Sequence, residues 1–332
     1  MSARGLAAAL VVAVTASAGV SAYLKFGAEV ASGTVPLKWA QLPVRYFVTD
    51  RGAPGAGATD LDAALTRAFR SWQDVDRATI TFERGGFTGS LPFEPDGVTV
   101  IGFLSRPDLE RTLGATAYTY DTRSGALVEA DIFLNSEFPW SVATGGEAGR
   151  FDLESVALHE IGHLTGLGHS ALGETELRPG GGRRVIAAEA VLFPIAFSPG
   201  SIAGRILRPD DIAGVSDIYP ESRFRSETGS ISGRVLKSGR GVFGAHLVAF
   251  NLRTGDLVGG YTLSEDGGFT LAGLEPGPHV VRVEPLDDGD VESFFDEAER
   301  VDLDFAATFA DRTVVVQAGR NAGDLTIRVD PR

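Results

Sequence analysis

The sequence predicts an α+β fold for the N-terminal part of the chain, followed by an all-β sandwich. Three observations lead to this expectation. Up to residue 222, strand-like runs are interspersed with apolar residues spaced three and four apart, as on a helix. From 229 to 332 only short alternating runs occur, separated by Gly, Asp and Pro turns. A polar stretch at 223–228 lies between the two parts and is interpreted as a linker, and a length of 332 residues suits about two domains.

The first domain is expected to span residues 36–222. Its first helix follows from a single apolar stripe, made of Leu61, Ala64, Leu65, Ala68, Phe69 and Trp72. A second helix runs from Asp152, which is placed to cap its N-terminus, to about Leu164. A third opens at Pro209 and ends before Pro220. The expected strands are Leu37–Trp39 continuing into Val44–Val48, then Thr79–Glu83, Gly97–Phe103, Ala115–Tyr120 and Ala130–Leu134.

Two further segments of this domain lack a clear helical or strand period. The Gly/Arg-rich stretch from Ala171 to Arg184 is expected to form a loop. Val191 to Phe197 is apolar, and one interpretation makes it simply another core segment.

The second domain is expected to be an antiparallel sandwich over residues 229–332. Its strands are expected at Ile231–Leu236, His246–Asn251, Leu257–Thr262, Phe269–Leu271, His279–Glu284, Thr313–Gln317 and Leu325–Val329. An insertion at 287–304 carries nine acidic residues and one basic residue. Ca²⁺ would suit so many carboxylates, but the fixed ligand order of an EF-hand is missing, and a solvated loop is the favoured interpretation.

The amino-acid composition excludes several kinds of partner and of reactive site. The chain has 30 Lys+Arg against 44 Asp+Glu, a net charge of −14, which argues against nucleic acid or an anionic membrane surface as partner. It has no Cys, which excludes disulfides, thiolate zinc sites and Cys nucleophiles. Any metal chemistry must therefore use carboxylates and the five His residues.

The N-terminus predicts export. Residues 1–22 carry one basic residue, Arg4, then an apolar run, then small residues with a cleavage site after Ala18 or Ala22. The alternative is an uncleaved anchor, because the stretch up to Leu24 approaches the ~20 residues that span a bilayer. No other segment is apolar for long enough, so we expect a secreted, periplasmic or cell-surface protein.

Residues 159–170 read HEIGHLTGLGHS and predict a metal site. His159 and His163 are four apart, so both imidazoles project from one helix face. Glu160 lies beside the metal and can accept a proton from a bound water without being a ligand. Gly166 suits a sharp turn after the helix, which returns the chain so that His169 supplies a third nitrogen. Three imidazoles leave a fourth position open, which is typical of a catalytic zinc site.

This motif resembles the zinc signature of the metzincins, and Ser170 after the third His is typical of their matrixin, matrix-metalloproteinase-like branch. The resemblance covers about residues 36–222. Its further motifs are Leu37-Lys38-Trp39, Leu113-Gly114-Ala115-Thr116-Ala117, Ala130-Asp131-Ile132-Phe133-Leu134-Asn135, Asp210-Asp211-Ile212 and Tyr219-Pro220.

The resemblance implies one catalytic Zn²⁺ with His159, His163 and His169 as ligands and Glu160 as general base. It implies a mixed five-stranded sheet with about three helices. Peptide substrate would lie antiparallel to an edge strand around Gly114 to Tyr118. Gly114 and Ala115 would contact it, and Phe193 and Pro194 would wall its pocket. Calcium is also compatible with the family, without ligands that we can assign.

The chain departs from the family in two ways. Metzincins place a Met in a turn under the zinc, whereas Leu192 occupies that place here, within Ala190–Pro194. A leucine fills a similar volume, and Leu/Met exchanges cost under about 1.5 kcal/mol. Matrixin zymogens often block the zinc with a propeptide Cys, which this chain cannot do.

Residues 229–332 resemble carboxypeptidase regulatory-like, transthyretin-like sandwich modules, in which the remaining His246 and His279 are expected to be ordinary strand residues. Such modules are spacers or binding adjuncts. We expect an exported zinc metalloendopeptidase that acts on proteins or peptides, with a monomer as the default. The alternative is an inactive surface or matrix-binding protein that retains a zinc site. A third hypothesis is a peptidase specialised for one secreted partner or for self-processing.

Overall fold

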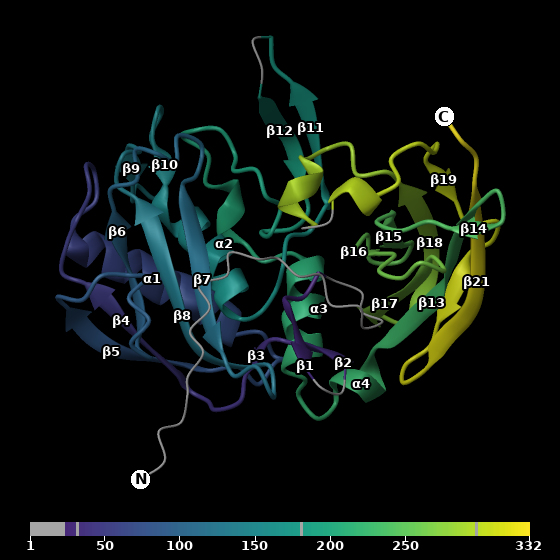
Figure 1. Cartoon of the computed structure of the whole chain (residues 1–332), viewed down its shortest axis with the longest axis horizontal. Coiled ribbons are helices and arrows are strands. Elements are labelled where there is room, and N and C mark those ends of the chain that lie inside the picture. The colour runs from purple at the N-terminus through teal and green to yellow at the C-terminus, as the bar shows by residue number, and fades with distance from the viewer. Residues whose placement is uncertain (1–23, 31–32, 180–181, 296–297) are drawn as a thin grey trace.

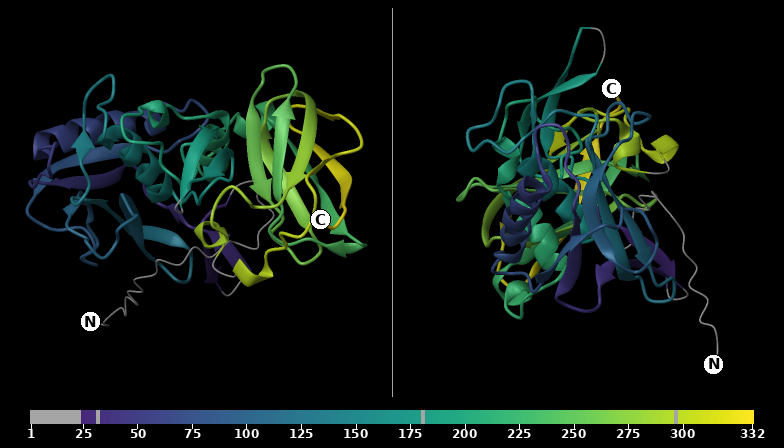
Figure 2. Two further views of the ribbon diagram at one scale, coloured as in Figure 1. Left: turned by 90° about the horizontal axis from the view of Figure 1, so that it is seen from above. Right: turned by 90° about the vertical axis from the view of Figure 1, so that its left-hand side faces the viewer.

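The computed structural model describes residues 24–30, 33–179, 182–295 and 298–332. The predicted signal, residues 1–22, lies outside them. Two domains lie side by side, with helix α3 (Pro209–Ile218) between them (Figures 1 and 2). The N-terminal domain combines helices with a mixed sheet, and strands dominate the C-terminal domain, so the predicted α+β class is confirmed. None of the helices in the described ranges is long and apolar enough to cross a membrane.

The N-terminal sheet runs in the order β3-β8-β6-β4-β5, and β7 also pairs with β8, outside this order. The strands are β3 (Lys38–Trp39), β4 (Val44–Thr49), β5 (Phe82–Thr88), β6 (Thr99–Leu104), β7 (Gly114–Tyr120) and β8 (Ala126–Asn135). Pairing is parallel throughout except between β7 and β8, which makes β7 an antiparallel edge strand.

The sheet differs from expectation in two places. Within the described residues it has six strands rather than five, because the chain bends at 40–43 and supplies both β3 and β4 where one strand was expected. The strand predicted at Thr79–Glu83 lies further along, at Phe82–Thr88. The backbone of Thr79 is instead engaged by Tyr219, whose carbonyl accepts its N–H.

The helices form where the apolar stripes predicted them. Helix α1 spans Ala58–Gln73, and every residue of its predicted stripe is buried. Helix α2 spans Leu153–Leu164, and its cap is confirmed because the Asp152 side chain accepts the N–H of Ser155 at 2.9 Å. The two helices pack together, and the Trp72 indole donates to the Leu158 carbonyl at 2.9 Å.

Three segments outside the sheet differ from the prediction or were not predicted. The expected loop at Ala171–Arg184 is wrong, because β11 (Gly173–Leu177) and β12 (Arg183–Ala188) form a hairpin there, with an ion pair from Arg184 to Glu176 across it. The predicted linker contains a helical turn, α4 (Phe224–Glu227), with a buried Phe224. A hairpin of β1 (Gly27–Val30) and β2 (Gly33–Pro36) precedes the first expected strand.

Smaller elements complete the N-terminal domain. They are β9 (Trp140–Ser141), β10 (Phe151–Asp152) and the 3-10 turn η1 (Ala203–Arg205).

The C-terminal domain has two sheets with apolar side chains buried between them. One contains β13 (Gly229–Lys237), β14 (Arg240–Gly241), β17 (Gly268–Leu274) and β21 (Asn321–Val329); the other contains β15 (His246–Asn251), β16 (Leu257–Tyr261), β18 (Gly277–Glu284), β19 (Thr308–Phe309) and β20 (Val314–Val316). The expectation of purely antiparallel pairing is wrong for one pair, since β13 and β21 are parallel.

The acidic insertion is not simply a solvated loop. It contains the 3-10 turns η2 (Val291–Ser293) and η3 (Ala298–Arg300), and Phe294 and Phe295 are each only 1% exposed. Both phenyl rings share an apolar cluster with Leu24 from the N-terminal segment. Charge alone suggested repulsion and exposure, but two adjacent aromatic side chains bury the centre of the insertion against the first domain.

Candidate metal centre

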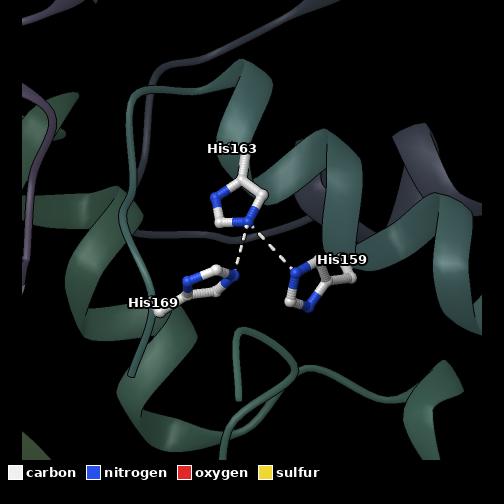
Figure 3. A group of neighbouring side chains, drawn as sticks. All are labelled: His159, His163 and His169. Carbon is white, nitrogen blue, oxygen red and sulfur yellow. Dashed lines mark hydrogen bonds between the residues drawn. The ribbon is translucent and has the colours of Figure 1, made fainter. Parts of the chain in front are cut away.

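Three histidines converge at the C-terminal end of helix α2 (Figure 3). His159 and His163 lie one turn apart on the helix, as their spacing requires. The Nε2 atom of His163 lies 3.0 Å from Nε2 of His159 and 3.2 Å from Nε2 of His169. One ligand atom from each residue lies within 4.8 Å of the others, so the group could hold one metal ion.

The return of the chain to His169 depends on Gly166. The helix ends at Leu164, and Gly166 follows with φ of +100°. A Cβ at this residue would lie 2.4 Å from the Leu37 carbonyl oxygen, so both the backbone angle and the space require glycine. The turn predicted at Gly166 is therefore confirmed.

Each imidazole is oriented through its second nitrogen. The Nδ1 atoms of His159 and His163 lie 2.8 Å from the carbonyl oxygens of Val191 and Leu167. Nδ1 of His169 lies 2.6 Å from the carbonyl oxygen of Ser293. A carbonyl can only accept, so each Nδ1 carries the proton and each Nε2 presents its lone pair to the centre. This outer shell is typical of metal-binding histidines, and the donor set fits a metal ion that prefers imidazole.

Burial keeps the imidazoles neutral. It lowers the pKa of His159 to about 3, with the neighbouring His169 acting in the same direction. The pKa of His163 falls well below its usual range, and that of His169 is also lowered, in both cases chiefly by burial. Neutral imidazole is the form that binds metals.

Glu160 lies beside the cluster and is 4% exposed. Its Oε2 accepts the hydroxyl of Thr116, on strand β7, at 2.8 Å. Burial raises the pKa of Glu160 to about 7, and the hydrogen bond from Thr116 acts against that rise. Gly114 allows the edge strand to approach, since a Cβ there would lie 3.1 Å from Oε1 of Glu160.

Leu192 lies in the turn under the histidines. It is 3% exposed, and its carbonyl accepts the N–H of Ser170 at 3.0 Å. Its side chain touches the helix at Gly162, where a Cβ would come within 2.8 Å of Leu192 Cδ2. The turn is held from α3 by the carboxylate of Asp211, which accepts the N–H of Val191 at 2.9 Å.

A cleft of about 380 Å³ opens over the cluster. It is lined by the predicted ligands and Glu160, and also by the other predicted substrate-contacting residues: Gly114, Ala115, Phe193 and Pro194. The structure therefore brings every predicted site residue together, with Leu192 beneath the cluster rather than in the cleft wall.

Some contacts within the site were not predicted. Thr116 contacts Glu160, and the Tyr118 hydroxyl donates to the His163 carbonyl at 2.8 Å. The sequence contained a signal for Thr116 and Tyr118, because they share one face of a strand with Gly114, which was predicted to lie at the site. Phe26, whose ring centre lies 5.6 Å from that of His163, and the Ser293 carbonyl had no local sequence signal.

Comparison with known proteins agrees with this geometry. Residues 38–179 match the family model described as Peptidase_M10, matrixin. Metalloendoproteinase 5-MMP of Arabidopsis thaliana is 28% identical over 180 residues, which cover 50% of this chain and 42% of that protein. Metalloendoproteinase 2-MMP of the same plant is 33% identical over 132 residues, covering 36% of this chain and 31% of the relative.

A rat protein is also similar to this chain. Matrix metalloproteinase-16 of Rattus norvegicus is 30% identical over 138 residues, which cover 40% of this chain and 22% of that protein. The chain thus spans less than half the length of each of these three curated relatives. The family match and the histidine cluster lie in the same part of the chain, so residues 38–179 are similar to the matrixins.

Proposed function

We propose that the protein is an exported zinc metalloendopeptidase that hydrolyses peptide bonds of proteins. The observation that carries this proposal is the convergence of three Nε2 lone pairs, each fixed by a carbonyl on Nδ1, beside a buried carboxylate in an open cleft. The matrixin match and the metalloproteinase relatives support the same activity.

In this proposal His159, His163 and His169 hold one Zn²⁺ and leave a position open to the cleft. A zinc ion bound there supplies Lewis acidity, which lowers the pKa of water and polarises a peptide carbonyl. Glu160 accepts the proton of the attacking water on its carboxylate and passes it to the leaving amine. The hydroxyl of Thr116 holds one carboxylate oxygen, at 2.8 Å, so that the other is free for this transfer.

Substrate would lie in extended form along β7. That strand pairs with β8 alone among the described strands, so its other edge has backbone groups available to a peptide. Gly114 and Ala115 would contact the peptide backbone, and Phe193 and Pro194 would wall a side-chain pocket, in keeping with their place in the cleft lining.

Three further assignments stay predictions. Export rests on residues 1–22. The C-terminal domain is proposed to be a carboxypeptidase regulatory-like sandwich, joined at 223–228. Calcium binding, without assigned ligands, is the third.

A Glu160→Gln variant tests the mechanism, because the amide keeps the shape of the side chain but cannot accept the proton. We expect one zinc per chain in both proteins, and chelator-sensitive cleavage of casein by the wild type. The variant should lose at least about 100-fold in kcat/KM, the scale of general-base catalysis. Cleavage undiminished in the variant would overturn the role of Glu160. Zinc binding without hydrolysis by the wild type, across broad peptide libraries, would favour the surface or matrix-binding alternative.

A further inference from the structure

We propose that the C-terminal domain is part of the metal centre, and that the turn at residues 290–295 of its insertion positions His169. This inference rests on the proposed zinc site. It assigns the second domain a role that a spacer would not have, because one of the three metal ligands would be oriented by a residue more than a hundred positions away in the chain.

His169 is the ligand that most needs an external support. His159 and His163 stand on a helix, and their Nδ1 atoms bond to carbonyls of the N-terminal domain. His169 lies beyond the helix, in a segment that follows the Gly166 turn. Its Nδ1 donates to the Ser293 carbonyl at 2.6 Å, so the orientation of its ring depends on the insertion.

The turn that carries this carbonyl is well defined. The N–H of Ser293 donates to the Asp290 carbonyl at 2.8 Å, and those of Phe294 and Phe295 donate to the Val291 carbonyl at 2.9 and 3.0 Å. These bonds fix the direction of the Ser293 carbonyl. In Figure 1 this turn, in yellow-green, lies between the base of the β11–β12 hairpin and the C-terminal sheets.

Phe294 anchors the turn against the ligand itself. Its ring centre lies 6.3 Å from that of His169, nearly perpendicular to it, and 6.2 Å from that of Tyr261. The Tyr261 hydroxyl in turn donates to the His169 carbonyl at 3.3 Å. Strand β16, through Tyr261, and the insertion therefore contact both the backbone and the ring of this ligand.

The start of the insertion is tied to the first domain independently. The carboxylate of Asp288 accepts the N–H of Thr175 at 2.7 Å, and the Thr175 hydroxyl donates to the Asp288 carbonyl at 2.9 Å. Thr175 belongs to β11, which follows His169 by only a few residues. The insertion therefore contacts the first domain at two places, at Thr175 through Asp288 and at His169 through Ser293.

The chain offers a control variant for the test. Phe294 and Phe305 are almost equally buried, at 1% and 0% exposed, but they belong to different apolar clusters. Phe294 faces His169, whereas the cluster of Phe305 does not include the turn. Phe294→Ala should release the turn and loosen His169, and Phe305→Ala should lower thermal stability without that effect.

The measurement is metal binding in the full chain, by competition of Zn²⁺ with a chelator and by the visible absorption of the Co²⁺-substituted protein. Loss of outer-shell support lowers metal affinity by about 10- to 100-fold. We expect that loss and an altered Co²⁺ spectrum for Phe294→Ala, and a change of less than about threefold for Phe305→Ala. If Phe294→Ala does not fold, Phe294→Leu keeps apolar bulk without the ring and should weaken binding in the same direction.

Two results would overturn the inference. Unchanged affinity in the Phe294 variant would show that the turn does not position His169, and an equal loss in both variants would show only general destabilisation. If the wild-type protein still binds one Zn²⁺, either result leaves the proposed zinc metalloendopeptidase unaffected. If the wild-type protein binds no zinc, both the proposed function and this inference are wrong.

Discussion

Two opposing effects determine the pKa of Glu160. Burial of the carboxylate raises its pKa to about 7, and the hydroxyl of Thr116, 2.8 Å away, acts in the opposite direction by donating to the charged form. A general base must be deprotonated before it can act. Activity should therefore fall as pH decreases through the pKa of Glu160, and a bound cation beside the carboxylate moves that acid limb to lower pH.

A Thr116→Val variant should move the acid limb back to higher pH. Loss of the donor removes a hydrogen bond to a charged group, which contributes about 1.5 kcal/mol, so we expect a displacement of about one pH unit. The check is kcat/KM measured between pH 5 and about 9. Thr119→Val, on the opposite face of the same strand, should leave the profile unchanged. A profile that is equally unchanged in Thr116→Val would contradict the role of Thr116.

Some residues of the candidate metal centre could be predicted from the sequence, and others could not. His159, Glu160 and His163 were predictable because one helix fixes their relative positions. His169 was predictable because Gly166 marks the turn that returns the chain. The Ser293 carbonyl was not, because a backbone acceptor has no residue type of its own and reaches the site only through packing of the second domain.

At the scale of elements, the packing of helix α2 on the Leu192 turn leaves no room for a side chain at residue 162. A Cβ there would lie 2.8 Å from both Leu192 Cδ2 and Trp72 Cζ2. Glycine inside a helix normally costs about 1 kcal/mol relative to alanine. The helix carries this cost between His159 and His163 because glycine at this residue allows close contact with the turn beneath the helix.

Gly162→Ala should consequently destabilise the protein, against the usual helix preference. Overpacking costs about 1–3 kcal/mol and outweighs the gain of about 1 kcal/mol in propensity. Urea unfolding of the metal-free protein measures the net change. In a Leu192→Ala background the same substitution should cost at least about 0.5 kcal/mol less, because one of the two crowded contacts is gone. An alanine variant more stable than the wild type would disprove the crowding.

Elements with a strong local pattern were predictable, and those that depend on partners were not. Helix α1 matches its stripe of apolar residues, and Asp152 caps α2 as expected. The β11–β12 hairpin was missed because its strands do not alternate apolar and polar residues, and none of their residues is fully buried. It is stabilised by partners such as Asp288, which lies far along the chain.

At the scale of the whole molecule, the two domains share buried surface rather than a flexible junction. The carboxylate of Asp210, on α3, accepts the N–H of Gly259, on β16, at 2.7 Å. Leu172 and Ala190 of the first domain pack with Val248 of the second. A polar stretch in the sequence indicated a linker, but composition says nothing about whether the faces on either side of a junction are complementary.

This shared surface predicts that both domains unfold in one cooperative transition. Calorimetric and van't Hoff enthalpies should agree. Trp39, Trp72 and Trp140 all lie in the N-terminal domain, so tryptophan fluorescence reports on that domain, and hydrogen exchange of β13 and β18 reports on the other.

Asp210→Ala leaves the buried N–H of Gly259 without its acceptor, which costs about 1–3 kcal/mol. Because the bond joins the domains, this loss should lower the midpoints reported by fluorescence and by hydrogen exchange together. Asp311→Ala, at an exposed site of the C-terminal domain, should move neither midpoint. Two separate transitions, or a change confined to one domain, would mean that the domains fold independently. The metal centre would then be assembled only when they dock.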